Sequence, residues 1–176
     1  WGLGTKKLVS VWIALSPATR ESGCMQMLPG SHLHPPMPHT DTQAEHNMLT
    51  RGQTIMEIDE RHAVDIELRT GEAALFDYSI AHASPPNQSD DRRIAIVLRY
   101  IPPETKQLLS DWDSAALVRG EDRYGHFEHE PEPTCDMDPV AVAFHRKAEE
   151  MQRQVYFNDT VCLECRVSVH GVESPY

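Results

Sequence analysis

The residues of this chain best suited to chemistry lie in one short segment, Gly71 to Arg99. A strand-like run ends at His82, Ser84 and Asn87 follow it, and Arg93 opens the next strand-like run. Side chains placed in this way can converge on one pocket when their strands are adjacent and antiparallel. An imidazole suits a first-row metal ion. A guanidinium beside a hydroxyl suits a carboxylate, because its planar fork pairs with both oxygens.

A metal ion together with a carboxylate clamp is what a 2-oxoglutarate site requires. The spacing alone does not establish a 2-oxoglutarate site, since a lone histidine in a β protein is more often structural than a metal ligand. An arginine at the start of a strand is likewise more often a solvated charge. The spacing by itself therefore favours the plainer interpretation.

The elements that must hold these residues show a period of two. Residues 9–15 alternate between two faces, with Trp12 and Ala14 opposite a face made of Val9, Val11, Ile13 and Leu15. Residues 93–101 repeat the alternation, and shorter strand candidates lie between them at Cys24–Leu28, Thr54–Ile58, Ala63–Leu68 and Ala73–Tyr78. Turn residues such as Pro29-Gly30-Ser31 separate the candidates. This pattern predicts a mainly β fold, either a sandwich or a barrel-like jelly roll.

The remaining segments are less regular. Residues 31–50 are rich in His, Pro and Thr and are predicted to be a long loop, either a binding segment or a surface excursion. Residues 104–137 are expected to be mostly loop and short helix. Asp138 and Pro139 predict a helix start, and apolar residues at 140, 144, 148, 151 and 155 predict an amphipathic helix packed on the domain. We expect one domain over residues 1–157 and a tail of unknown structure over 158–176.

Composition narrows the class of protein. The chain has 176 residues, of which 40% are apolar and 24% charged, so it can bury a core and is not of disordered composition. Its net charge of −11 makes binding to nucleic acid or to an anionic membrane unfavourable. No apolar run approaches the ~20 residues of a membrane span, and no secretory signal is visible. We expect a cytoplasmic protein that acts on a small molecule, with an oligomeric state that the sequence does not indicate.

The four cysteines, Cys24, Cys135, Cys162 and Cys165, do not form the pattern of a disulfide framework. Cys162 and Cys165 make one C-x-x-C, which would need further ligands from Cys135, His126 and His129 to hold zinc. Ordinary thiols are the preferred interpretation. Cys24 lies in a predicted strand and is expected to be a small buried residue.

A series of short motifs runs in order through residues 1–157. They are Val11-Trp12-Ile13-Ala14-Leu15, Glu21-Ser22-Gly23-Cys24-Met25, Pro29-Gly30-Ser31-His32, Arg51-Gly52-Gln53, Gly71-Glu72, and His82-x-Ser84-x-x-Asn87 with Arg93. Together they resemble the phytanoyl-CoA dioxygenase family of iron(II)- and 2-oxoglutarate-dependent oxygenases.

The resemblance implies a fold and a set of roles. The fold is a double-stranded β-helix, a cupin-like jelly roll with peripheral helices whose open end holds the metal. His82 becomes one iron ligand, and Arg93, helped by Ser84, becomes the partner of the 2-oxoglutarate C5 carboxylate. Trp12 resembles the tryptophan beside the cosubstrate, although a core aromatic explains it nearly as well. Asn87 is expected to shape its loop, and His32 to belong to a turn.

One departure limits what the resemblance implies. The family binds iron through a His-x-Asp pair plus a distal histidine, and the first thirty residues here contain no His-x-Asp. Either the chain is part of a longer protein or it has lost metal binding. We expect these 176 residues alone to be inactive; if they are active, the nearest replacement ligands are His32, His34, His39 and Asp41.

For the complete protein the resemblance implies a dioxygenase that uses iron(II), 2-oxoglutarate and O2. Such an enzyme hydroxylates a small organic molecule and releases succinate and CO2. A related halogenase and a cupin-like module without catalysis are the alternatives, and the substrate is not indicated by the sequence.

Overall fold

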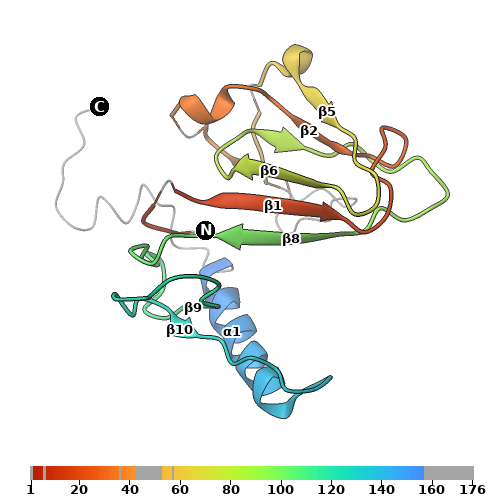
Figure 1. The fold of residues 1–176 in the computed structure, drawn as a ribbon. Coiled ribbons are helices and arrows are strands. Elements are labelled where there is room, and N and C mark those ends of the chain that lie inside the picture. The colour runs from red at the N-terminus through yellow and green to blue at the C-terminus, as the bar shows by residue number, and fades with distance from the viewer. Residues whose placement is uncertain (1, 6, 36, 43–52, 57, 157–176) are drawn as a thin grey trace, which may run out of the picture. The chain divides into compact units, whose positions relative to one another are not determined.

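The computed structural model describes residues 2–5, 7–35, 37–42, 53–56 and 58–156. The described chain is mainly β, with several small sheets and one α-helix (Figure 1). It divides into two compact units, residues 7–101 and residues 1–6 with 102–176. The predicted iron ligand and cosubstrate residues, Trp12, His82, Ser84 and Arg93, belong to the unit of residues 7–101.

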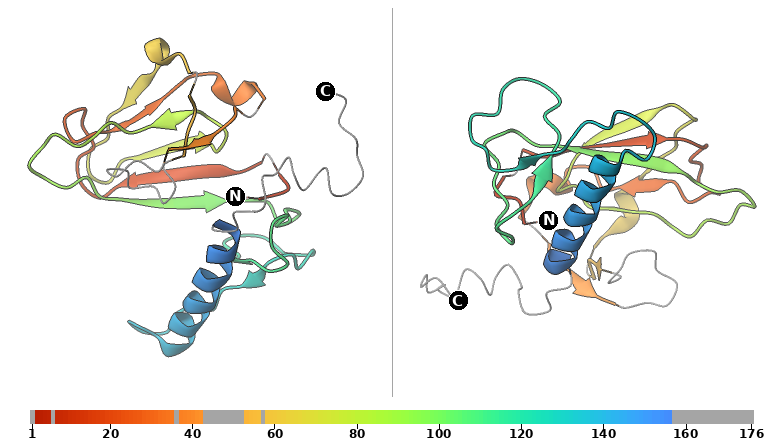
Figure 2. Two further views of the ribbon diagram at one scale, coloured as in Figure 1. Left: turned by 180° about the vertical axis from the view of Figure 1, so that it is seen from behind. Right: turned by 90° about the horizontal axis from the view of Figure 1, so that it is seen from below.

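The first sheet of residues 7–101 is antiparallel, in the order β6 (Ala73–Asp77), β1 (Val9–Ala14) and β8 (Ala95–Tyr100). β1 and β8 run side by side in every view (Figures 1 and 2). The alternation predicted for residues 9–15 is present, because Ser10, Trp12 and Ala14 are buried and their neighbours are half-buried or exposed. The small and aromatic side chains of β1 therefore face the core.

The second sheet is also antiparallel, in the order β5 (Val64–Ile66), β2 (Met25–Met27) and β7 (His82–Ala83). Met25 and Met27 are buried and join Trp12 and Ala14 in one apolar cluster, which Ala18 and Cys24 complete. The two sheets thus pack against each other through this cluster. Burial of its apolar surface is the main source of stability for the unit.

One strand prediction is wrong over its described part. Instead of Thr54–Ile58, the structure has β4 (Gln53–Thr54), and residues 55, 56 and 58 belong to no strand. The Asp59 carboxylate accepts a hydrogen bond from the Arg61 N–H and starts the 3-10 turn η2 (Glu60–His62), so the chain turns before a longer strand can form.

The predicted loop over residues 31–50 also contains regular structure. It begins with the 3-10 turn η1 (Ser31–Leu33) and includes β3 (Thr40–Asp41), which pairs with β4. Residues 43–52 lie outside the described residues.

In the second unit, residues 104–137 contain two short strands, β9 (Ser114–Ala115) and β10 (Glu128–His129), which pair in parallel. The short helix predicted within these residues is absent, and the prediction is wrong. Turn chemistry replaces it, because the Asp122 carboxylate accepts hydrogen bonds from the N–H groups of Tyr124 and Gly125.

The α-helix α1 (Pro139–Tyr156) begins where the sequence predicts. Asp138 accepts hydrogen bonds from both the N–H and the hydroxyl of Thr134, and from the N–H of Val140 at 2.8 Å. The bonds from Thr134, followed by the one from Val140, lower the pKa of the Asp138 carboxyl to about 2. The carboxylate is therefore a cap that holds both the helix and the turn before it.

Within the same unit, α1 packs on the loops that precede it. The Phe144 ring lies 6.0 Å from the Trp112 ring, and Lys147 Nζ lies 4.4 Å above Trp112 and 2.5 Å from the Glu128 carboxylate. No helix in the described ranges has the length and apolar character needed to cross a bilayer. The predicted tail, 158–176, lies outside the described residues.

Replacing Asp138 by Ala should lower the melting temperature by roughly 2–4 °C at neutral pH, because the donors of Thr134, Val140 and Ala141 lose their acceptor. The folded-state pKa lies below the ordinary aspartate value, so this stabilisation is present above about pH 4 and disappears as the pH falls through about 2. Thermal unfolding at a series of pH values measures the difference. Asp136→Ala, at an exposed residue of the same turn, is the matched control. An equal loss in both variants, or a difference that is as large at pH 2 as at neutral pH, would contradict the capping role.

Candidate functional site

His82 faces the space between the two sheets. It is paired with Met27 across the second sheet, and directly paired residues of an antiparallel sheet share one face. Its imidazole ring is exposed, with its centroid 5.5 Å from that of the Phe76 ring on β6. Its Nδ1 lies 2.8 Å from the Ile80 carbonyl oxygen. Because a carbonyl can only accept, the neutral ring carries its hydrogen on Nδ1 and keeps a free lone pair on Nε2.

Arg93 lies two residues before β8 and therefore on the same side as Ala95, which packs on the core. Its guanidinium carbon lies 5.4 Å from the centre of the Trp12 ring, and Trp12 is only 7% exposed. A guanidinium over an indole face is attracted by the ring's negative face. Within the described part of the chain no carboxylate lies within ion-pair distance of Arg93. A half-buried cation with an aromatic partner and no anionic one is suited to an anionic ligand.

Ser84 and Asn87 lie in the exposed loop between β7 and Arg93. The Ser84 hydroxyl forms no hydrogen bond with any described residue, so its help to Arg93 stays a prediction. Asn87 shapes the loop as the sequence predicts: its oxygen accepts from the Ser89 N–H, and its amide donates to the Asp91 carbonyl.

A close contact between two loops fixes the start of this segment. Gly23 has a left-handed φ of 74°, and a Cβ there would lie 2.4 Å from the Pro85 carbonyl oxygen. The Gln88 N–H also donates to the Glu21 carbonyl. Only glycine allows the two backbones to approach so closely, and the loop after His82 is thereby attached to the turn before β2.

Cys24 lies beside the site but is not suited to take part in it. Its side chain is fully buried, and burial raises the pKa of its thiol, with a smaller contribution from the carboxylates of Asp65 and Glu67. Arg20 and Arg93 act in the opposite direction with smaller effect. The thiol is neutral at physiological pH and is a poor nucleophile or metal ligand in that form. The prediction of a small buried residue is confirmed.

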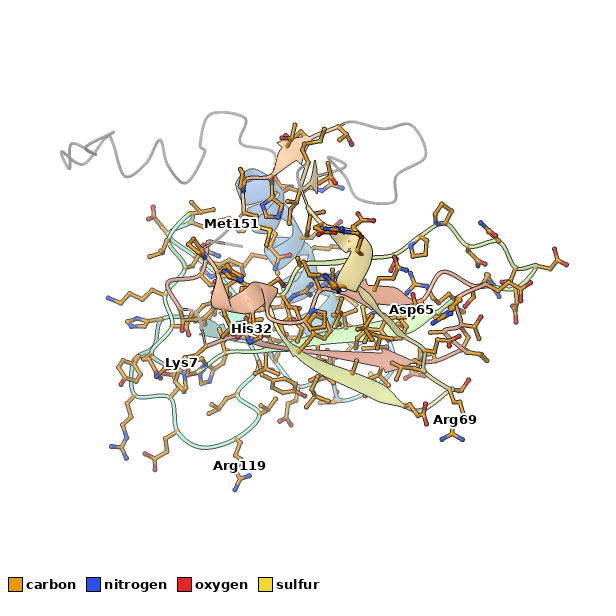
Figure 3. All side chains as sticks on the ribbon, turned by 90° about the horizontal axis from the view of Figure 1, so that it is seen from above. Lys7, His32, Asp65, Arg69, Arg119 and Met151 are labelled. Carbon is orange, nitrogen blue, oxygen red and sulfur yellow. The ribbon has the colours of Figure 1, made fainter. Side chains whose placement is uncertain are left out.

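The other histidines form no second metal site among the described residues. No group of three His, Cys, Asp or Glu side chains there is placed to hold a metal ion. His32 belongs to η1, as predicted for a turn residue, and its label in Figure 3 lies beside that turn. The set His32, His34, His39 with Asp41 therefore fails as a metal site, and Cys135, His126 and His129 form none by themselves. Cys162 and Cys165 lie outside the described residues.

Sequence reasoning missed two residues that the structure places next to the site. The Ser16 hydroxyl bonds to the backbone of residues 92 and 94, on either side of Arg93. The Ser31 hydroxyl accepts from the N–H of Ala81, directly before His82. Ser16-Pro17 and Pro29-Gly30-Ser31 were visible as turn signals, but no local pattern shows which distant strand a turn serine will reach.

Comparison with known proteins identifies the family. The family model described as phytanoyl-CoA dioxygenase (PhyH) matches residues 3–95, just over half of the chain. The chain belongs to the phytanoyl-CoA dioxygenase family. The matched residues contain most of the first unit, including β1, β7 and Arg93.

Relatives within and beside the phytanoyl-CoA dioxygenase family agree with this assignment. The peroxisomal phytanoyl-CoA dioxygenase of Bos taurus is 30% identical over 97 residues, which are 54% of this chain and 29% of the bovine protein. The apo structure of the non-heme monooxygenase ThoJ superimposes with a TM-score of 0.75 and 35% identity, covering 88% of this chain and 55% of ThoJ. A ThoJ–nickel complex gives a TM-score of 0.71 and 32% identity, covering 91% of this chain and 56% of ThoJ.

The chain therefore spans less than a third of the bovine phytanoyl-CoA dioxygenase and just over half of ThoJ. A structural likeness at 35% identity shows that the β fold of this chain is that of a non-heme monooxygenase. This likeness concerns the fold and not the activity of the complete polypeptide.

The hydrogen bond to Ile80 predicts the tautomer of His82. In the metal-free protein, neutral His82 should carry its proton on Nδ1, and zinc should shift the Nε2 resonance more than the Nδ1 resonance. Long-range 1H–15N NMR of the imidazole rings measures both. His129 is the control with the opposite expectation, because its Nε2 lies 3.2 Å from the Asp122 carboxylate and should carry the proton. A neutral His82 protonated on Nε2 would contradict the arrangement.

Proposed function

We propose that this chain supplies one iron ligand and the 2-oxoglutarate clamp of a non-haem iron(II) dioxygenase. The enzyme hydroxylates a small organic molecule and releases succinate and CO2. The observation that carries the proposal is the presence, in one unit, of a histidine whose Nε2 has no partner and an arginine that has no carboxylate partner among the described residues. Both lie on the inner faces of the same two sheets.

The fold supports the proposal. Two three-stranded antiparallel sheets that pack face to face are the arrangement from which a double-stranded β-helix, or jelly roll, is built. We propose that fold for the complete polypeptide, with α1 as its C-terminal amphipathic helix. β7 and β8, which present His82 and Arg93, each lie at an edge of their sheet among the described residues. Further strands of a longer chain would add to the sheets at these edges.

The described residues can supply one ligand of a metal centre. His82 offers a neutral imidazole with Nε2 free, and its other nitrogen is held by a backbone carbonyl, a partner that fixes the ring of many metal-binding histidines. The described residues supply no complete ligand set, so the other ligands must come from elsewhere in the polypeptide. When bound, iron(II) supplies the O2-dependent redox chemistry of this family.

Arg93 and Trp12 form the binding site for the cosubstrate. The guanidinium can pair with both oxygens of the 2-oxoglutarate C5 carboxylate, and Ser84 stands in the loop from which a hydroxyl would add a further hydrogen bond. The Trp12 ring covers one side of the guanidinium and keeps water from it. Exclusion of water strengthens the charge pair, because the local dielectric constant is lower.

Replacing Arg93 by Ala should raise the 2-oxoglutarate requirement about thirtyfold or more, since losing one partner of a desolvated charge pair costs roughly 2–5 kcal/mol. Lysine at the same position should recover only part of the loss, because an ammonium cannot form the planar fork. Succinate formation is measured against 2-oxoglutarate concentration in the complete polypeptide. Arg92→Ala removes the exposed neighbouring charge and is the control, expected to change little. An unchanged requirement in Arg93→Ala would place the clamp elsewhere.

The 176 residues alone should not turn over, because His82 is a single ligand and isolated imidazole is not selective for iron(II). Incubation with iron(II), ascorbate and 2-oxoglutarate should give no more succinate than a His82→Ala control. The complete polypeptide should give succinate that the same substitution abolishes. Succinate from the 176 residues above that control would show that the ligands are misassigned. Its absence from the complete polypeptide would favour the cupin-like module without catalysis.

A further inference from the structure

A serine hydroxyl holds the backbone on both sides of Arg93. Ser16 lies just past the end of β1, and its Oγ accepts a hydrogen bond from the Ile94 N–H at 2.8 Å and donates one to the Arg92 carbonyl at 2.8 Å. The N–H groups of Leu15 and Ser16 both donate to the Ile94 carbonyl. The chain around Arg93 is therefore fixed to the end of β1, the strand that carries Trp12.

A second serine hydroxyl holds the residue before His82. The Ser31 hydroxyl accepts a hydrogen bond from the Ala81 N–H at 2.8 Å, and Ser31 is only 5% exposed. The Ala81 carbonyl in turn accepts from the Leu28 N–H at 2.9 Å. Gly30, with a left-handed φ of 81°, allows the turn that brings Ser31 back over Ala81. Both backbone groups of Ala81 are thus bound to residues 28–31.

These two bonds occur where a sheet can no longer supply a partner. β2 turns away at Pro29, and β1 is followed by the turn at Pro17, so the N–H groups of Ala81 and Ile94 would otherwise lack an acceptor on the neighbouring strand. Leaving the N–H of buried Ala81 without an acceptor is costly, whereas at Ile94, which is 43% exposed, the bond to Ser16 replaces one to water. Each hydroxyl therefore extends the pairing by one residue, and in each case that residue adjoins a side chain of the proposed site.

We propose that Ser16 and Ser31 are positioning residues, Ser16 for the Arg93 guanidinium and Ser31 for the His82 imidazole. The proposal rests on the proposed function, since it assigns the serines to the carboxylate clamp and to the metal ligand. The two serines bond to residues that precede different strands, β8 for Ser16 and β7 for Ser31. Their effects should therefore be separable. Loss of the Ser16 hydroxyl should weaken 2-oxoglutarate binding, and loss of the Ser31 hydroxyl should weaken metal binding.

The test uses Ser16→Ala and Ser31→Ala in the complete polypeptide, with Ser16→Thr and Ser31→Thr to restore a hydroxyl. Ser22→Ala is the matched control, because Ser22 is buried and its hydrogen bonds all lie within residues 17–22. Three quantities are measured: amide hydrogen exchange at Ala81 and Ile94, the affinity for zinc alone, and the 2-oxoglutarate requirement at saturating iron(II).

Ser16→Ala should raise the 2-oxoglutarate requirement roughly five- to tenfold and speed exchange at Ile94, with zinc affinity unchanged, as expected for one lost hydrogen bond. Ser31→Ala should weaken zinc binding by a similar factor and speed exchange at Ala81, with the 2-oxoglutarate requirement unchanged. The threonine variants should recover both properties, and Ser22→Ala should alter neither.

Three results would overturn the proposal, and they are distinguishable. Equal losses of affinity for 2-oxoglutarate and for zinc in all the alanine variants would show that the substitutions destabilise the fold as a whole. Normal binding in Ser16→Ala and Ser31→Ala, while Arg93→Ala and His82→Ala lose their ligands, would remove the positioning role and leave the proposed function intact. Normal binding in Arg93→Ala and His82→Ala would remove the proposed function itself, and the positioning role with it.

Discussion

The register of β1 determines which side chains meet Arg93 and His82 from the first sheet. β1 pairs with β6 on one edge and β8 on the other, and it places Ser10, Trp12 and Ala14 inward. The pairing with β8 brings Arg93 over Trp12, and the pairing with β6 turns Phe76 toward His82. A shift by one residue would move each of these side chains to the opposite face. Packing of the Trp12 ring in the core is what makes such a shift costly, because the indole would then be exposed to water.

Arg93 differs from the paired arginines of this acidic chain in a way that suits it to bind an anion. The chain carries a net charge of −11, and several of its other described arginines are paired with acids, as Arg20 is with Asp65 and Arg69 with Glu72. Such exposed pairs add little stability. Arg93 instead contacts an aromatic ring, inside the fold, where screening is weaker. An acidic protein repels a dicarboxylate at long range, so recognition of one must depend on a local, partly dehydrated cation of this kind.

Periodicity predicted β1 and β6 because alternate residues of each, such as Trp12 and Phe76, pack toward the core. It failed at Thr54–Ile58, where the Asp59 turn limits β4, and at 104–137, where side-chain acceptors such as Asp122 favour turns over helix. The resemblance singled out His82 and Arg93 as candidate site residues. The roles of Ser16 and Ser31 could not be predicted, because their hydrogen bonds join residues 76 and 50 positions apart, and such partners follow from the fold alone.

The burial of Cys24 has a consequence for how the protein can be studied. Its thiol is protonated and inaccessible while the two sheets are packed, so alkylating reagents and peroxide can reach it only when the sheets separate. Cys135 is exposed and reacts without any opening. The ratio of the two labelling rates would then report the free energy of opening the core, measured in the folded protein and under native conditions. Cys24, which takes no part in the chemistry, would thus report the stability of the core against local opening.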